Sequence, residues 1–187
     1  MRLWKGTLVV LLLTMLTAAL PASLGVAAAD DPATVLQRFI EARNRGDVAG
    51  ALALVTDDFR FVGGPFCTQA NPCIGTAAQR KELETYIVER AHGNIVGTPQ
   101  VSGTTVRARL EASGDRFSAG GVDRVVNTLT VEVRDGKLAS WLAVLDASDA
   151  QTAQYLAYVR AQGGPPSAPP RTGGGGETSF IHRLGDG

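Results

Sequence analysis

The dipeptide Asp135-Gly136 separates two strand-like runs, and it constrains the fold more than any other part of the chain. An Asp-Gly pair between such runs favours a two-residue hairpin turn, because both residues tolerate positive φ. In the first run, one face holds Val125, Asn127, Leu129, Val131 and Val133, and the other holds Thr128, Thr130, Glu132 and Arg134. This alternation predicts an antiparallel hairpin that packs one face and leaves the other face wetter.

The first 29 residues have the layout of a secretory signal peptide. Arg2 and Lys5 precede an apolar run from Leu8 to Leu20, and small residues lead up to Ala29. The run holds about 13 residues, whereas a helix that spans a bilayer needs about 20. We therefore predict cleavage near Ala29 and a secreted or periplasmic protein with no membrane contact after cleavage. The alternative is an uncleaved membrane anchor.

The rest of the chain is expected to hold one folded domain, residues 30–162, followed by a disordered tail. Residues 163–187 are rich in Gly and Pro and cannot bury enough apolar surface to offset their ordering entropy. The signal segment carries two of the 18 basic residues and none of the 18 acidic ones, so the mature chain has a net charge of −2. A nucleic-acid partner needs a basic surface, and this composition does not indicate one.

The two cysteines, Cys67 and Cys73, lie close together in a predicted loop. An exported chain meets an oxidising compartment, which favours a disulfide between them. A metal or redox pair is the weaker alternative, because the spacing is not C-x-x-C. The predicted domain contains a single histidine, His92, and no metal-ligand pattern, so we expect no metal and no cofactor.

Helices come first in the predicted order and antiparallel strands follow, which indicates an α+β fold. Asp31 and Asp47 each precede a run with helical spacing and are predicted helix caps. Thr76 and Gln79 fit a capping box at the start of a third helix, which is expected to end near His92. The remaining predicted elements are strands at 59–62, 95–101 and 104–110, the hairpin, and a last helix capped by Ser148-Asp149.

Three segments of the chain resemble the nuclear transport factor 2-like superfamily and, within it, the SnoaL-like polyketide cyclases and steroid isomerases. They read VLQRFIEARNRGDVAGALALVTDDFRF, GTAAQRKELETYI and VEVRDGKLASW. The resemblance implies a cone-shaped fold, in which a curved antiparallel sheet wraps around helices and a pocket opens at the wide end. This superfamily includes isomerases, dehydratases, cyclases, epoxide hydrolases and proteins that only bind, so the fold leaves the chemistry open.

The resemblance also shows that positions catalytic in these enzymes are occupied differently here. Related steroid isomerases carry an aspartate base where this chain has Gly64, and a tyrosine donor where it has Phe39. SnoaL-like cyclases carry an aspartate in the last strand, and the matching residue here is Ala143. None of these side chains can accept a proton or donate to an oxyanion. The resemblance therefore implies binding without catalysis, or catalysis with a different base.

Asp123 and Asp146 are the candidates for such a base. Asp123 begins the penultimate strand and faces either a pocket mouth or solvent beside Arg124. Asp146 ends the last strand, and its alternative role is structural because it stands just before a helix cap. His92 is expected at a helix end, where the dipole favours its charged form, without a partner for catalysis. An enzyme would need a buried carboxylate with a raised pKa beside a hydrogen-bond donor.

Residues of the packed faces are predicted to line a pocket: Phe39, Phe61, Tyr86, Asn127 and Trp141. Asn127 is polar on an apolar face, so it either lines a cavity or bonds to backbone. Plain core packing is the alternative for Tyr86 and Trp141. Arg107 and Arg109 alternate with apolar residues and form either the wet face of a strand or a site for an anionic ligand.

From these features we predict a secreted protein that binds a small, largely apolar molecule without catalysis. One alternative is a cofactor-free isomerase, dehydratase or cyclase that uses an aspartate base. Another is an interaction module that forms a homodimer through the open face of its sheet.

Overall fold

The computed structural model describes residues 30–63 and 67–163. The predicted signal peptide, Gly64 and all but the first residue of the predicted tail lie outside these ranges. No helix within the described part of the chain is long and apolar enough to cross a membrane.

Five helices and six strands make up the described chain. In order, the elements are α1 (Pro32–Asn44), α2 (Val48–Ala53), β1 (Val55–Val62), β2 (Cys73–Ile74), α3 (Gly75–Val88), β3 (His92–Ser102), β4 (Thr105–Ser113), α4 (Asp115–Ala119), β5 (Val125–Arg134), β6 (Lys137–Leu145) and α5 (Ala150–Ala161).

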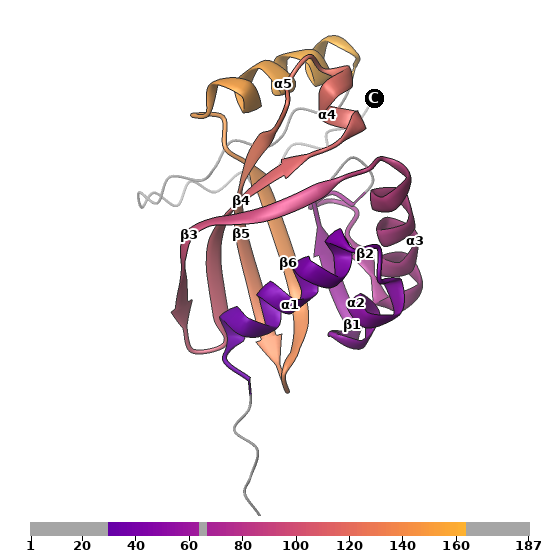
Figure 1. Ribbon diagram of the computed structural model, residues 1–187, viewed down its shortest axis with the longest axis vertical. Coiled ribbons are helices and arrows are strands. Elements are labelled where there is room, and N and C mark those ends of the chain that lie inside the picture. The colour runs from indigo at the N-terminus through magenta and orange to yellow at the C-terminus, as the bar shows by residue number, and fades with distance from the viewer. Residues whose placement is uncertain (1–29, 64–66, 164–187) are drawn as a thin grey trace, which may run out of the picture.

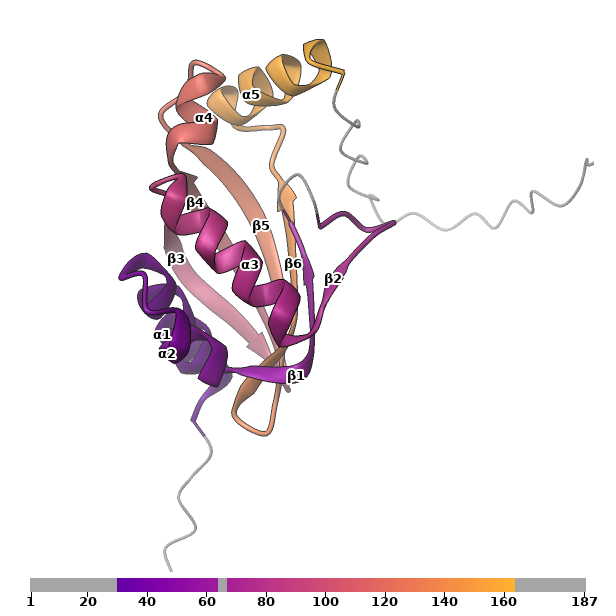
Figure 2. The same ribbon diagram turned by 90° about the vertical axis from the view of Figure 1, so that its right-hand side faces the viewer.

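The six strands form one curved sheet in the order β2-β1-β6-β5-β4-β3. Neighbouring strands are antiparallel except for β1 and β6, which run parallel. Helices α1 and α3 lie against one side of the sheet, and α4 and α5 cover one end of it (Figure 1). The side view shows the sheet bending around these helices (Figure 2). This arrangement confirms the predicted α+β class and the curved sheet.

The central hairpin forms as the sequence predicts. Asp135 and Gly136 have φ of 52° and 71° and join β5 to β6, as a two-residue turn with two positive φ values requires. Along β5 the predicted inner residues are buried, whereas Thr128 and Arg134 are exposed. The backbone register therefore places the predicted apolar face against the helices.

The caps of α1, α2 and α5 confirm the sequence prediction. The carboxylate of Asp31 accepts a hydrogen bond from the Thr34 amide, and Asp47 and Asp149 do the same for α2 and α5. Each cap satisfies an amide that has no partner inside its helix.

The prediction for the third helix is wrong at both ends. Helix α3 begins at Gly75 after Ile74, with no side-chain cap, so Thr76 lies inside the helix. Pairing of β2 with β1 holds the chain at Ile74, and this contact places the helix cap two residues earlier than the capping box requires. The helix ends at Val88, and His92 is the first residue of β3 rather than part of a helix end. The five-residue helix α4, which the sequence reading missed, is too short for an apolar repeat to reveal.

Aromatic side chains from three elements form the centre of the main core. The Trp141 ring of β6 lies 5.7 Å from Phe39 of α1 and 6.1 Å from Phe61 of β1, measured between ring centroids. Such pairs add about 0.5–1.5 kcal/mol each beyond the area that they bury. A second, smaller cluster joins Tyr155 of α5 to Val122 and Val125 at the end of the sheet.

A disulfide joins Cys67 to Cys73, as the sequence predicts, and closes the segment between β1 and β2. We expect reduction to lower the free energy of unfolding by about 2 kcal/mol, because the open loop gains conformational entropy in the unfolded chain. Urea unfolding with and without dithiothreitol measures this difference. The double variant C67A/C73A is the control and should not respond to dithiothreitol. An unchanged midpoint, with two free thiols titrated after reduction, would contradict the expectation.

Candidate functional site

The inner face of the sheet forms one wall of the candidate site. Across β5 and β6 the paired residues of this face are Val131 with Trp141, Leu129 with Ala143, and Asn127 with Leu145. The wall is apolar apart from Asn127. That residue lies between Leu129, which belongs to the main core, and Val125, which belongs to the smaller cluster.

The opposite wall comes from α1 and α3, and it is more polar than a core face usually is. On α3 the buried residues recur with helical spacing and are Gln79, Glu82, Leu83 and Tyr86. On α1, Arg43 follows Phe39 by four residues and therefore extends from the same helix face. The interior thus holds a cation, a carboxylate and a carboxamide among aromatic side chains.

The Arg43 guanidinium is held by aromatic rings. Its central carbon lies 3.7 Å from the centroid of the Tyr86 ring and 5.5 Å from that of Trp141. Both distances allow cation–π attraction, which strengthens when the pair is removed from water. Burial lowers the pKa of Arg43, while Tyr86 and Glu82 oppose that shift and Arg116 adds to it. The guanidinium remains charged at neutral pH because its ordinary pKa is so high.

A hydrogen-bonded group around Asn44 fixes the Tyr86 ring beneath this cation. The Tyr86 hydroxyl donates to the Asn44 side-chain oxygen over 3.1 Å, and the Gly93 amide donates to the same oxygen over 3.0 Å. The Asn44 amide group in turn donates to the Gly93 carbonyl over 2.7 Å. A Cβ at position 93 would lie 3.3 Å from the Tyr86 hydroxyl, so a glycine there permits the close approach. Helices α1 and α3 and strand β3 are thereby joined at one point.

Two polar atoms on the helix wall lack partners within the described ranges. The Nε atom of Arg43 and the Oε1 atom of Gln79 are buried and make no hydrogen bond there. No ion pair within 4.0 Å joins Glu82 to any described cation, although its side chain is buried. Leaving a buried polar group unsatisfied costs about 1–3 kcal/mol, and more when the group is charged. Two such atoms on one wall, beside the buried carboxyl of Glu82, therefore indicate a place for water or a ligand.

Burial raises the pKa of Glu82, against the attraction of Arg43 and Arg116 and with added repulsion from Glu89. Its carboxyl consequently keeps a proton at a higher pH than an exposed glutamate does. Burial likewise raises the pKa of Tyr86, which the charge of Arg43 partly offsets.

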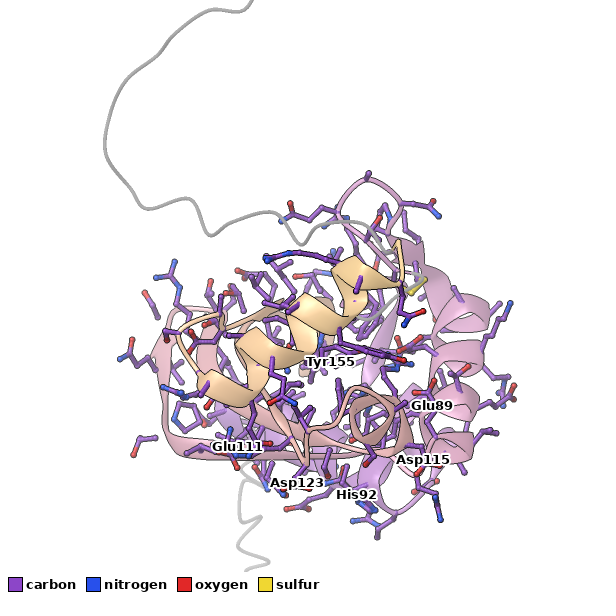
Figure 3. The ribbon with its side chains drawn as sticks, turned by 90° about the horizontal axis from the view of Figure 1, so that it is seen from above. Glu89, His92, Glu111, Asp115, Asp123 and Tyr155 are labelled. Atoms are coloured by element: carbon purple, nitrogen blue, oxygen red, sulfur yellow. A yellow bond between two sulfur atoms is a disulfide. The ribbon has the colours of Figure 1, made fainter. Side chains whose placement is uncertain are left out.

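A second charged pair closes the end of the interior beside α4. Arg116 forms an ion pair with Glu89, and both side chains are partly buried. Tyr155 points from α5 toward α4 and Glu89 (Figure 3), and its ring packs edge-on against Phe117 at 5.1 Å. Burial raises the pKa of Tyr155; Arg116 opposes this shift to a smaller extent, and Glu89 and Tyr158 add to it. The charges of Arg43, Glu82, Arg116 and Glu89 therefore act on one another across the interior.

The five residues predicted to line a pocket are all buried on the inner side of the sheet: Phe39, Phe61, Tyr86, Asn127 and Trp141. Ala143, one of the positions that are catalytic in related enzymes, is half-buried on the same face, opposite Leu129. A hollow of about 410 Å³ lies elsewhere, between α1 and α2, and includes none of these residues. We place the candidate site in the interior because the polar groups without partners lie there.

The two candidate aspartates lie outside this interior cluster. Asp123 is exposed, at the same end of the molecule as His92 and Glu111 (Figure 3). Asp146 accepts hydrogen bonds from the amide and hydroxyl of Ser148, and these bonds lower its pKa. These bonds favour the ionised form of Asp146, whereas a buried acid/base residue would have a raised pKa. Arg109, on the outer face, forms an ion pair with Asp146 at 3.5 Å.

Sequence reasoning missed the residues that distinguish the site, although a signal was present. Glu82 shares a helix face with Leu83 and Tyr86, and Arg43 shares one with Phe39. A charged residue on an apolar helix face is the same type of signal that singled out Asn127 on β5. Within the described ranges, no group of three or more His, Cys, Asp or Glu side chains could hold a metal ion.

Comparison with known proteins defines the family. The sequence model of the SnoaL-like domain matches residues 36–141, which is more than half of the chain. The chain belongs to the SnoaL-like domain family. No curated protein matches it. The family assignment confirms the resemblance found in the sequence. Membership of the family does not by itself identify the activity of this protein.

Solved structures share the SnoaL-like fold with this protein at low identity. SalBIII, an epoxide hydrolase/cyclase-like enzyme in polyether salinomycin pyran formation, has a TM-score of 0.52 and 17% identity over 63% of this chain and 92% of its own. A computationally designed 17-OHP binder has a TM-score of 0.53 and 19% identity over 63% of this chain and 92% of its own. A candidate polyketide cyclase from Xanthomonas campestris pv. campestris has a TM-score of 0.50 and 24% identity over 66% of this chain and 96% of its own. At these identities the likeness shows the fold alone.

The raised pKa of Glu82 predicts how stability depends on pH. The folded state keeps the Glu82 proton at pH values where the unfolded chain has lost it, so this residue reduces stability as pH rises above its ordinary range. We expect E82Q to gain stability relative to the wild type between pH 5 and pH 8, measured by urea unfolding. E84Q, an exposed change on the same helix, should show no such trend. If E82Q instead loses stability at pH 8, attraction to Arg43 and Arg116 outweighs burial.

Proposed function

We propose that this SnoaL-like protein is secreted and binds a small, largely apolar molecule between α1, α3 and the inner face of its sheet. The observation that carries the proposal is the pair of buried polar atoms without partners on the helix wall, Nε of Arg43 and Oε1 of Gln79, next to the buried side chain of Glu82. A core that served packing alone would be more stable with apolar residues at these positions. A mostly apolar wall with a few convergent polar groups is the usual composition of a small-molecule site.

The opposite wall supports the apolar character of the ligand. The sheet offers Leu129, Ala143 and Trp141, and α1 adds Phe39. Ala143 is the small residue of this set, and its side chain faces the interior next to Trp141. Enlarging this residue would fill interior space without removing any of the polar groups.

Occupancy of the interior can be followed through tryptophan emission. The sequence has two tryptophans, so the full chain carrying W4F reports on Trp141 alone. We expect a saturable change in its emission with neutral apolar molecules such as 4-phenyl-1-butanol and 1-decanol. A143F in this background should weaken binding by at least about tenfold, because the added ring occupies the same space. A147F, at an exposed position beyond β6, is the matched control. Equal affinities of the two variants would place the ligand elsewhere, and an unchanged emission with every molecule would overturn the proposal.

Proton transfer is the second candidate function, and Glu82 favours it. Related enzymes place an acid/base group in the same interior, and Glu82 is a buried carboxylate with a raised pKa close to the charge of Arg43. A base with a raised pKa accepts a proton near neutral pH more effectively than an exposed carboxylate does. The aspartates predicted from the sequence, Asp123 and Asp146, remain the alternative bases.

This candidate can be tested without knowing the natural substrate. We expect the protein to exchange the α-protons of 4-phenyl-2-butanone for deuterium in D₂O, followed by proton NMR. E82Q should slow the exchange by about 100-fold or more, since general-base catalysis contributes 10²–10⁴-fold. D123N and D146N, compared in parallel, should leave the rate unchanged. Loss of exchange in either aspartate variant, with E82Q fully active, would assign the base to that aspartate.

A further inference from the structure

The half-buried side chain of Arg43 has a buried N–H donor without a partner among the described residues. Stacking on Tyr86 occupies a face of the guanidinium plane, and the N–H groups point outward within that plane. The buried Nε atom has no acceptor among the described residues. The edge of the guanidinium therefore offers parallel N–H donors, the arrangement that binds a carboxylate with two hydrogen bonds.

The carboxylates of the described protein do not fill this role. Glu82, the acid that acts most strongly on Arg43, forms no ion pair with it within 4.0 Å. Glu89 is already paired with Arg116. The Asn44 hydrogen bonds fix Tyr86, and the Tyr86 ring holds the guanidinium, so the cation is positioned independently of any acid.

The neighbouring charges decide which kind of anion fits. Glu82 is close enough to Arg43 to influence it, so a ligand with two negative charges would meet repulsion there. A ligand with one carboxylate balances the single charge of Arg43 and brings no second negative charge toward Glu82. The aromatic and aliphatic wall made by Phe39, Leu83 and Trp141 leaves an apolar environment for the rest of the molecule.

We propose that the ligand is a monocarboxylic acid with an apolar body, and that the edge of Arg43 binds its carboxylate. This inference rests on the proposed function, because it assigns chemistry to the same interior site. It makes Arg43 the residue that selects acids over neutral molecules of equal shape.

Matched pairs of probes separate this inference from simple binding. Isothermal titration calorimetry at low salt would compare 4-phenylbutanoate with 4-phenyl-1-butanol, and decanoate with 1-decanol, on the full chain. We expect each acid to bind at least about tenfold more tightly than its alcohol, the effect of a charge-assisted pair removed from water. R43M should abolish this preference, so that each acid binds no more tightly than its alcohol in that variant. R38M, which removes an exposed arginine of the same helix, is the matched control.

Each other outcome has a defined meaning. Equal binding of acid and alcohol, or a preference that survives in R43M, overturns the carboxylate inference and leaves ligand binding intact. Absence of binding by every probe overturns both proposals. If R43M does not fold, the Arg43 Nε–H signal in the nitrogen-15 NMR spectrum, assigned with R43K, decides the question. That signal should shift on addition of decanoate and not of 1-decanol, and an unmoved signal in saturated protein overturns the inference.

Discussion

The register of β5 between β4 and β6 is the constraint on which the rest of the molecule depends. Because side chains alternate along a strand, a slip of one residue would turn Asn127, Leu129 and Val131 away from the helices. The Asp135-Gly136 turn sets the pairing next to it, Val133 with Leu138, and an irregularity between Val133 and Glu132 then shifts the register by one residue, so that Val131 pairs with Trp141. The same alternation places Trp141 of β6 against α1. The aromatic core and the sheet wall of the site thus depend on the pairing of β5 with β6 beyond this irregularity.

The helix wall shows how polarity is tolerated inside this core. Asn44 satisfies both the Tyr86 hydroxyl and the Gly93 backbone, so that part of the interior is fully hydrogen-bonded. Arg43 and Glu82 lie next to it and lack such partners within the described chain. Buried charges without partners are far more costly than hydrogen-bonded amides. The contrast within one small region assigns a structural role to Asn44 and leaves a ligand-related role for Arg43 and Glu82.

Features that depend on local periodicity could be predicted from the sequence. The hairpin, the caps at Asp31 and Asp149, and the disulfide each rest on a short pattern with a direct physical cause. The start of α3 could not be predicted in the same way, because pairing of β2 with β1 overrides the local capping preference. Arg43 was not predicted as a site residue for a related reason. The sequence places Arg43 on the helix face of Phe39, but the rings that contact its charge come from α3 and β6, which are distant in the sequence.

The separation of Arg43 from Glu82 distinguishes this interior from a closed ion pair and is consistent with the proposed binding of a ligand. Two opposite charges in a core gain most by direct contact, and a flexible arginine would ordinarily provide it. Here the Tyr86 ring lies against the guanidinium, and Asn44 prevents that ring from turning away. The backbone of β3 holds Asn44 in turn through Gly93. The fold therefore keeps a cation and an acid apart in the interior, and the proposed carboxylate ligand would supply the acceptor that Arg43 Nε lacks among the described residues.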